Sequence, residues 1–379
     1  MSGDTDFQAS DRSTGEVKSR FRVTASSEKN VDGSVIVQSS EVSSDMDDLE
    51  LDLDKIEQAH RLDNIQISFA IFYDFFVVTA ARYLQLSFFE KFFVLQYRNP
   101  DGVVSYTRGI DDTYLVLTII VNMMLVRSLT MRLVFYPLAQ LAGIHNFKAI
   151  QRFKEQSWSL VYYSTSWLFG FYLFWNSNYF LNLDRVFEGW PHNHLSHSFK
   201  LYYLIQTGCW LQQIIVLNIE EKRKDYLQMF SHHIITSILC IGSYYTYFTQ
   251  VGHVILLLMD IVDVFLALAK VLKYLGFNRI CDFMFLVFMA SWVVLRHGVY
   301  NYVFWYIATK SENIMQHDCP RFPPGSTEIC YSPYLITGFL VLLAGLQIIT
   351  IVWLYMIIKV ALRVVKGDSA EDVRSDGEE

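Results

Sequence analysis

Two stretches of this sequence indicate a helical protein with ionisable groups inside a membrane: Met229-Phe-Ser-His-His-Ile-Ile-Thr236 and Leu258-Met-Asp-Ile-Val-Asp-Val-Phe265. Both are mainly apolar, and each lies in a longer apolar run. The titratable side chains within them are His232, His233, Asp260 and Asp263. An ionisable group at membrane depth costs several kcal/mol unless it is paired or hydrated. These four residues are therefore the first candidates for a functional site.

The composition divides the chain into an apolar, basic body and two acidic ends. Hydrophobic residues make up 52% of the 379 residues. Residues 1–60 carry a net charge of −8 and residues 367–379 carry −5, so the remaining body is about +6. The many Ser, Asp and Glu residues predict that residues 1–60 are mostly disordered. A basic body suits anionic lipids or a phosphate-bearing substrate, and an excess of Lys and Arg in cytoplasmic loops explains most of the charge.

The hydropathy pattern predicts an all-α fold, a polytopic membrane bundle of about eight spanning helices. A spanning helix needs roughly 20 mainly apolar residues. The candidates are 64–83, 113–135, 158–176, 199–218, 229–249, 253–272, 281–305 and 334–357. Arg127 and Arg132 interrupt the second candidate. We expect a tight hairpin between the fifth and sixth, with Gly252 supplying the flexible backbone of its turn.

The distribution of basic residues predicts the orientation of the chain. Lys and Arg are enriched in cytoplasmic loops. The connections after the second, fourth, sixth and eighth candidates hold these basic residues: His145, Lys148, Arg152, Lys154, Lys222, Arg223, Lys224, Lys273, Arg279, Arg363 and Lys366. Both termini are therefore predicted to be cytoplasmic. The loop that holds Cys319 and Cys330 is predicted to be lumenal, where an oxidising environment permits a disulfide between them.

Helical geometry predicts how the four titratable residues are arranged. Residues three apart share a helix face, so Asp260 and Asp263 are expected to point the same way. His232 and His233 are about 100° apart, so only one can face the carboxylates directly. The axial offset between His232 and Asp263 is roughly 7–8 Å, which is the size of a gap that could hold a reacting amide. A buried polar network that joins helices is the alternative. No metal site is predicted, because adjacent histidines seldom bind one ion together.

Two further sets of cations are candidates. Lys222, Arg223 and Lys224 lie just outside the helix end that carries the histidines. They could bind an anionic headgroup or nucleotide phosphates, or simply mark a cytoplasmic loop. Arg296 lies inside the seventh candidate span. A buried arginine needs an anionic partner, for which one of the two aspartates is the obvious choice, unless it snorkels to the interface.

The order of these motifs resembles the Lag1p motif of ceramide synthases, within the TRAM–Lag1–CLN8 (TLC) family. The resemblance rests on Arg223-Lys-Asp-Tyr-Leu-Gln-Met-Phe-Ser-His-His-Ile-Ile-Thr236, Ser243-Tyr, Val251-Gly, Asp260-x-x-Asp263 and Ala269-Lys270. It extends from about Ser157 to Leu362, and Leu295-Arg-His297 resembles the fungal branch. The chain departs from many relatives at Tyr247, Gln250, Met259, Val262 and Ala267, and none of these changes removes the four titratable residues.

The resemblance implies a reaction, a location and a set of partners. A ceramide synthase transfers a fatty acyl group from acyl-CoA to the amine of a sphingoid base, dihydrosphingosine or phytosphingosine, in the endoplasmic reticulum membrane. Acyl-CoA is then a co-substrate, and no further cofactor and no nucleic-acid partner is expected. A small accessory membrane subunit is implied, and a homo- or hetero-dimer stays open. The implied organisation is a cytoplasmic tail at 1–60, membrane helices at 61–150, the TLC catalytic domain at 151–362 and a cytoplasmic tail at 363–379.

The expected chemistry assigns roles to the candidate residues. The protonated amine of a sphingoid base must lose a proton before it attacks a thioester, and histidine is suited to take it near neutral pH. We expect one of His232 and His233 to act as the general base, or alternatively to attack the thioester and form an acyl-imidazole. Asp260 and Asp263 would orient that histidine or hold the ammonium. The cations at 222–224 would hold the CoA phosphates.

Two other classes of function are compatible with part of the pattern. A non-enzymatic TLC protein, such as a lipid sensor or a translocation-associated protein, would bind lipid without acyl transfer. A proton-coupled transporter would also use intramembrane His and Asp residues. The sequence shows no repeated halves of the kind that many transporters have.

Overall fold

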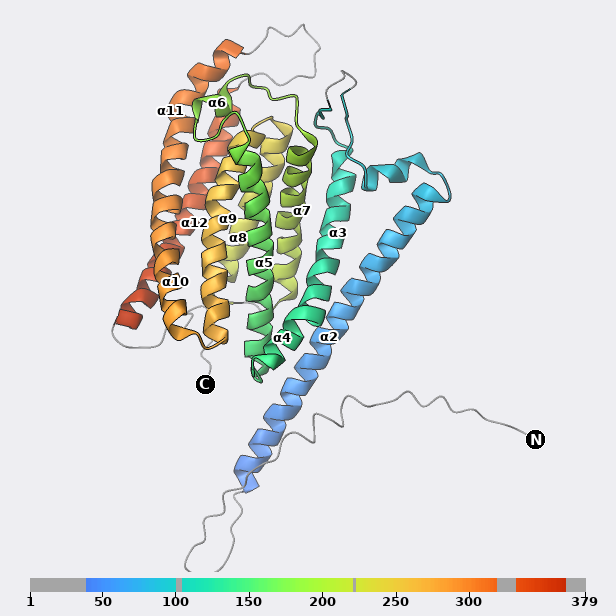
Figure 1. Cartoon of the computed structure of the whole chain (residues 1–379), viewed down its shortest axis with the longest axis vertical. Helices are drawn as coiled ribbons and strands as arrows, with labels where there is room; N and C mark the ends of the chain where they lie inside the picture. Colours follow the sequence, from blue (N-terminus) through green and yellow to red (C-terminus); the bar gives the residue numbers. More distant parts are fainter. Residues whose placement is uncertain (1–38, 100–103, 221–222, 319–331, 366–379) are drawn as a thin grey trace, which may run out of the picture. The chain divides into compact units, whose positions relative to one another are not determined.

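The computed structural model describes residues 39–99, 104–220, 223–318 and 332–365, and it is helical in nearly all of them (Figure 1). The α-helices are α2 (Ser39–Arg82), α3 (Asp112–Thr130), α4 (Tyr136–Leu141), α5 (Phe147–Trp175), α6 (Asp184–Phe187), α7 (His197–Ile219), α8 (Tyr226–Tyr245), α9 (Thr249–Tyr274), α10 (Asn278–Ser291), α11 (Tyr300–Asp318) and α12 (Pro333–Val365). A short 3-10 helix, η1, covers Ser87–Phe92. The predicted all-α fold is confirmed for this part of the chain.

Two π-helical segments join α-helices into longer rods. The segment η2 (Met131–Phe135) joins α3 to α4, and η3 (Trp292–Val299) joins α10 to α11. The helix therefore continues through Arg127 and Arg132, the two charges that interrupt the second predicted span. Arg127 is buried and forms an ion pair with Glu220, while Arg132 donates a hydrogen bond to Asn64. Paired in this way, both cations are accommodated without a break in the helix.

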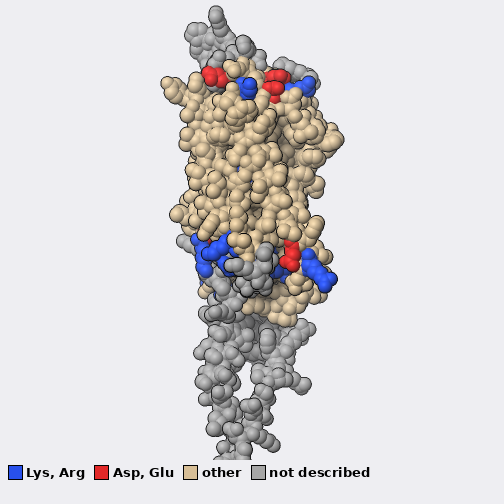
Figure 2. Space-filling model, turned by 90° about the vertical axis from the view of Figure 1, so that its left-hand side faces the viewer, with Lys and Arg blue, Asp and Glu red and all other residues tan. Residues whose placement is uncertain are grey.

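Four helices in the described part of the chain are long and apolar enough to cross a membrane. They are Glu57–Arg82, Asp112–Leu141, Asn278–Met315 and Pro333–Arg363. The other four predicted spans also form helices, α5, α7, α8 and α9, and these are not among the four candidate spans. Figure 2 shows the side formed by α10, α11 and α12, where charged residues gather at the two ends and a broad uncharged belt lies between them. This surface suits a lipid bilayer, because the hydrocarbon region excludes charge.

Helices α5, α7, α8 and α9 pack side by side within the bundle. Helix α5 packs along α9, and α7 packs against α8. Helix α3 covers α7, while α10, η3 and α12 cover α8 and α9 (Figure 1). Buried polar residues gather on this inner group: Lys154, Glu155, Lys200, Gln206, Gln212, His233, His253 and Asp260. A helix with many polar side chains lowers its free energy by turning them toward other helices rather than toward lipid.

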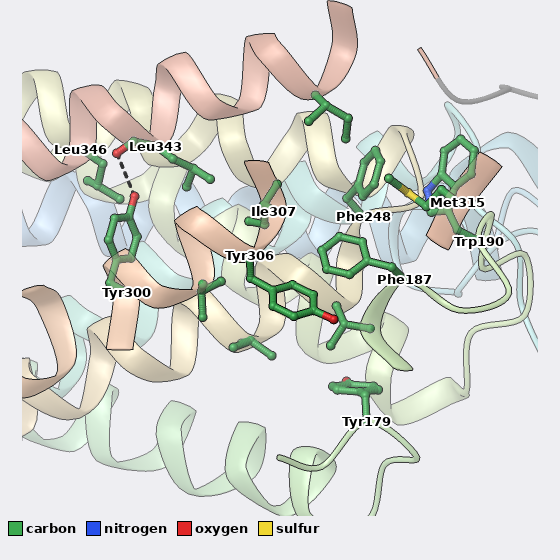
Figure 3. Packing of buried hydrophobic residues seen from close by; sticks show 14 of the residues in the cluster. Tyr179, Phe187, Trp190, Phe248, Tyr300, Tyr306, Ile307, Met315, Leu343 and Leu346 are labelled. Atoms are coloured by element: carbon green, nitrogen blue, oxygen red, sulfur yellow. Dashed lines mark hydrogen bonds between the residues drawn. The ribbon is translucent and has the colours of Figure 1, made fainter. Parts of the chain in front are cut away.

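A large apolar cluster joins α11 and α12 to the α8–α9 hairpin (Figure 3). Phe248 lies in the hairpin turn, where its ring stacks on Trp190 at 5.3 Å between centroids and meets Phe339 of α12 at 5.6 Å. The hydroxyl of Tyr300 donates a hydrogen bond to the carbonyl of Leu343 at 2.8 Å. These contacts fix the hairpin, and therefore the depth of the residues that α8 and α9 carry.

The prediction for the turn between α8 and α9 was wrong in one respect. The tight hairpin exists, but the residue with positive φ is Tyr247 (φ 65°), and Gly252 lies inside α9. Gly252 is needed for close packing instead, because a Cβ there would collide with the Tyr203 hydroxyl. That hydroxyl pairs with Ser243 at 2.5 Å, so Gly252 lets α7, α8 and α9 meet.

The N-terminal part differs from the composition-based prediction. The described residues from Ala59 onward form one compact unit. Helix α2 begins at Ser39, so residues 39–60 are helical where the composition predicted disorder. No Gly or Pro interrupts that stretch, and its Leu and Glu residues favour helix. Within the compact unit, Tyr73 and Asp74 bond to Thr118 and Asn122 of α3. Residues 1–38, Lys222, Cys319, Cys330 and the tail from 366 lie outside the described residues.

Candidate active site

A cavity of about 750 Å³ lies between α5, α8, α9, η3 and α12. We call it the polar chamber, because charged side chains from these helices line much of it. A second pocket of about 60 Å³, the apolar pocket, is lined mainly by hydrophobic side chains of α8, α9 and α12. His232, Asp263 and Arg296 line both. These three residues therefore mark the junction between a polar space and an apolar one.

The histidines lie in the second turn of α8 and are packed by tryptophans. Both rings line the polar chamber, and their centroids are 5.5 Å apart. The ring of Trp210 lies 5.4 Å from His232 and 5.5 Å from His233, and Trp353 lies 5.3 Å from His232. The Nδ1 atom of each imidazole is buried without a hydrogen-bond partner among the described residues. This leaves Nε2 as the nitrogen that can face a substrate.

The two aspartates have different neighbours. Asp263 lines both cavities, and its Oδ2 accepts from the Arg296 guanidinium at 2.8 Å. Asp260 is buried and accepts from Gln206 at 3.2 Å and from Ser166 at 3.4 Å. It is not among the residues that line either cavity. The structure therefore brings Asp263 and the histidines to one space, and it places Asp260 in a network with α5 and α7.

The outer end of the polar chamber is rich in charge. The chamber lining holds eight Lys and Arg residues against four Asp and Glu residues. Arg223 is engaged with Glu155 at 2.5 Å, and Arg152 contacts the same carboxylate at 3.3 Å. Further cations reach the chamber from α9 and α12 and from the segment before α8: Lys224, Lys270, Lys273 and Arg363. The net positive lining suits a multiply charged anion.

Glu220 sits at this charged end, just after the last residue of α7. Burial, together with the neighbouring Glu155 carboxylate, raises the pKa of Glu220 to about 7. The ion pair with Arg127 acts in the opposite direction and favours the ionised carboxylate. The charge of the chamber lining therefore changes near neutral pH.

Comparisons with known proteins place the chain in a family. The profile of the TLC domain (TRAM–LAG1–CLN8) matches residues 152–359, which hold the histidines, both aspartates and Arg296. This chain belongs to the TLC domain family. A sphingosine N-acyltransferase-like protein of Alternaria alternata is 43% identical over 75% of this chain and 71% of that protein. A sphingosine N-acyltransferase of Schizosaccharomyces pombe is 40% identical over 76% and 73%, and a ceramide synthase of Saccharomyces cerevisiae is 30% identical over 73% and 67%.

Several site residues of this TLC protein escaped the sequence analysis. Trp210 and Trp353 pack on the histidines, and Gln206 and Ser166 hold Asp260. A tryptophan or glutamine within an apolar run carries no signal that separates a site residue from a packing residue. Only the way α5, α7 and α12 meet α8 and α9 brings these side chains to the site. As a TLC protein with four apolar helices of spanning length in its described part, the chain is a multi-pass membrane protein.

Proposed function

We propose that this protein is a ceramide synthase, which transfers a fatty acyl group from acyl-CoA to the amine of a sphingoid base. Its TLC relatives carry that activity in their names at 30–43% identity. The observation that carries the proposal is the junction of His232, Asp263 and Arg296 between the polar chamber and the apolar pocket. Acyl-CoA has a polar nucleotide and an apolar chain, and its thioester lies at the boundary between them.

The histidines supply the proton transfer that the reaction needs. An alkyl ammonium cannot attack a carbonyl until it loses a proton, and an imidazole can accept that proton near neutral pH. The ammonium first releases one proton to give the neutral amine. As that nitrogen attacks, the Nε2 of His232 or His233 takes a second proton from it and returns this proton to the departing CoA sulfur, so the reaction releases one proton overall. Asp263, beside His232 at the junction, holds the ammonium before transfer. In the alternative route, His232 attacks the thioester first and an acyl-imidazole passes the chain to the amine.

The two cavities divide the co-substrate between them. The CoA phosphates occupy the charged end of the polar chamber, where Lys270, Lys273 and Arg363 line the space with Lys224. Of the three cations expected for this role, Arg223 is engaged with Glu155, and Lys222 lies outside the described residues. The acyl chain enters the apolar pocket. At about 60 Å³ this pocket is far smaller than the polar chamber of about 750 Å³, so a long acyl chain requires its lining side chains to move apart.

The proposed membrane arrangement has eight spans and two cytoplasmic ends. Helices α5, α7, α8 and α9 each contain 20 residues or more, which at 1.5 Å per residue is about the thickness of the hydrocarbon core. Their polar residues face one another rather than lipid. The charged end of the polar chamber then faces the cytoplasm, where acyl-CoA is available, in the endoplasmic reticulum membrane. A small accessory membrane subunit belongs to the same proposal.

Turnover by the purified protein tests the proposal. The protein in lipid nanodiscs is incubated with dihydrosphingosine or phytosphingosine and a series of acyl-CoAs of increasing chain length, and products are identified by mass. We expect an amide whose formation needs both substrates. A folded protein that binds these lipids but forms no amide would indicate the non-enzymatic class instead, and proton-dependent uptake into vesicles would indicate a transporter.

A further inference from the structure

Arg296 lies at the junction between the polar chamber and the apolar pocket, and its ion pair with Asp263 does not explain this position. It is 4% exposed, lies in the π-helical segment η3, and lines both the polar chamber and the apolar pocket. Of the described residues, only His232 and Asp263 share that double position. A guanidinium stays protonated at any physiological pH. Arg296 therefore places a permanent positive charge where the two cavities meet.

The hydrogen bonds of Arg296 hold the group and leave part of it unused. Its Nη2 donates to Asp263 Oδ2 at 2.8 Å and to the Met259 carbonyl at 2.8 Å. The guanidinium lies 4.2 Å from the centroid of the Trp292 ring, which fixes its plane. Its Nε is buried and has no hydrogen-bond partner within the described part of the chain. A buried donor without a partner costs about 1–3 kcal/mol, a cost that a hydrogen bond to a ligand would remove.

The local backbone gives a second, independent indication. A π-helical turn is less stable than an α-helical one and occurs frequently at functional sites. The segment η3 carries both Arg296 and the Trp292 ring that supports it. The Trp292 indole donates to His297 at 3.2 Å, and His297 also bonds to Gln347 of α12 at 2.7 Å. These contacts hold the π-helical turn, and with it Arg296, in a fixed orientation.

A row of aromatic rings connects Arg296 with the reacting histidine. Trp292, on which the guanidinium stacks, lies 6.3 Å from Trp353, and Trp353 lies 5.3 Å from His232. The guanidinium and the imidazole are thus supported by one continuous wall of the polar chamber. A thioester that reaches His232 from this chamber also comes within the surroundings of Arg296.

We propose that Arg296 is a catalytic residue that donates a hydrogen bond to the oxyanion formed from the thioester carbonyl; this rests on the ceramide synthase function proposed above. When the amine nitrogen bonds to the carbonyl carbon, the C=O electron pair moves onto oxygen and the amine proton passes to histidine. When the oxyanion collapses, the C–S bond breaks and the proton passes to the sulfur, giving the amide and free CoA. The acyl-imidazole route also passes through an oxyanion. The role of Arg296 is therefore the same in both routes.

Positioned charge is well suited to this task. A preorganised donor aimed at a developing oxyanion stabilises the transition state more than the bound substrate, and so lowers the barrier. It needs no reorganisation as the charge develops. Asp263 and Met259 use one nitrogen of the guanidinium, and the rest of its edge remains for the substrate oxygen. If the ion pair with Asp263 were the whole role of Arg296, a neutral pair of residues at 263 and 296 would serve equally well.

The test compares Arg296→Met with wild type in purified, nanodisc-embedded protein. We expect kcat to fall about 100- to 1,000-fold, with KM for acyl-CoA within about threefold of wild type. Binding of S-hexadecyl-CoA, a thioether without a carbonyl, is expected to be unchanged, because this ligand has no oxygen for Arg296 to contact. Arg279→Met, the same change at an exposed arginine of α10, is the matched control and should leave kcat unchanged.

A double-mutant comparison separates catalysis from charge neutralisation. We expect Asp263→Asn/Arg296→Met to fall at least tenfold in kcat below Asp263→Asn alone, because the oxyanion still lacks its donor. Equal kcat values for these two variants would reduce Arg296 to a partner of Asp263 and overturn the proposal. Wild-type-like kcat in Arg296→Met, or a parallel loss of thioether binding, would overturn it as well. An inactive wild type would instead reject the ceramide synthase function itself.

Discussion

The inner helices α5, α7, α8 and α9 and the outer helix α12 belong to one bundle but are built by different rules. Helix α12 is a nearly continuous Leu, Ile and Val run, and much of its surface is exposed in the isolated chain, including Val341, Ile348 and Tyr355. Helix α9 carries Asp260, Asp263 and Lys270 in a similar length. The outer helix meets lipid, whereas the inner helices meet one another. Hydropathy alone does not show which helices meet lipid and which meet one another.

The difference between the inner helices and α12 shows where the candidate active site lies. Polar side chains are retained in the inner helices, where each can find a partner or a cavity. Asp260 takes hydrogen bonds from α5 and α7, and Asp263 takes its ion pair from η3. The two histidines line the polar chamber, and each has a buried Nδ1 that meets no partner in the described part of the chain. The contrast predicts that the same kind of substitution has effects of different size in the two regions.

The largest expected effect is loss of the reacting imidazole. His232→Ala and His233→Ala, made singly, should each insert normally, and the variant that removes the base should lose about 100- to 10,000-fold in kcat. Ile348→Ala on the lipid-facing side of α12 is the outer control and should keep its kcat. Rapid-quench mass spectrometry with acyl-CoA alone would reveal an acylated peptide at position 232 or 233 only if the acyl-imidazole forms. Full turnover in both histidine variants would contradict the base assignment.

A charge placed on the outer helix tests the lipid-facing surface. Ile348 is 63% exposed and lies near the middle of α12. Aspartate at a helix centre costs about 2.5–3.5 kcal/mol on insertion scales, so Ile348→Asp should reduce the inserted fraction strongly. Tyr334→Asp, at the start of the same helix, should have little effect. A glycosylation reporter fused after α12 measures both. Equal insertion of the two variants would show that Ile348 does not face lipid.

Two glycines give a smaller and more precise comparison. A Cβ at Gly252 in α9 would collide with the Tyr203 hydroxyl, whereas nothing lies within 4 Å of one at Gly338 in α12. We expect Gly252→Ala to destabilise the fold by about 1–3 kcal/mol through overpacking. Gly338→Ala should be neutral or stabilising by up to about 1 kcal/mol, since alanine favours helix. Thermal unfolding in detergent measures both, and similar shifts would argue against the close approach of α7 to α9.

The sequence predicted where the helices lie along the chain better than it predicted which helices contact one another. All eight predicted spans are helices, because a run of about 20 apolar residues carries its own signal. An acidic partner for Arg296 was also expected, and Asp263 lies 2.8 Å away. The separation of Asp260 from Asp263 was not foreseen, since a shared helix face says nothing about which helices lie opposite. Asp260 is held by Gln206 and Asp263 by Arg296, and these two partners come from helices that are distant in the sequence.

The π-helical turns and the tryptophan wall were beyond sequence analysis for a related reason. Nothing in Trp292–Val299 distinguishes a π-helix from an α-helix by hydropathy, because the change of geometry depends on contacts such as that of His297 with Gln347. The role of Gly252 likewise depends on contacts between helices that the sequence does not show. Its flexibility suggested a turn, but the small size of its side chain is what the packing of Tyr203 requires.

The smallest expected effect concerns the charged end of the inner group. The pKa of Glu220 is raised to about 7 by burial and by Glu155, so this carboxyl is mostly neutral at pH 6 and mostly ionised at pH 8. Ionisation adds a negative charge to a chamber that should bind CoA phosphates. The KM for acyl-CoA should therefore rise between pH 6 and pH 8 in wild type, by about two- to fivefold at low salt. Glu220→Gln should remove that part of the rise.

Comparing wild type with Glu220→Gln separates the effect of the Glu220 carboxyl on KM from the effects of other groups that titrate. Protonation of the CoA phosphates changes with pH in both, so only the difference between their KM profiles reports the carboxyl. Glu188→Gln, at an exposed glutamate that lines neither cavity, should follow wild type. If KM in Glu220→Gln rises as steeply as in wild type, the phosphates lie away from Glu220, and Lys270, Lys273 and Arg363 would bind them farther along the chamber.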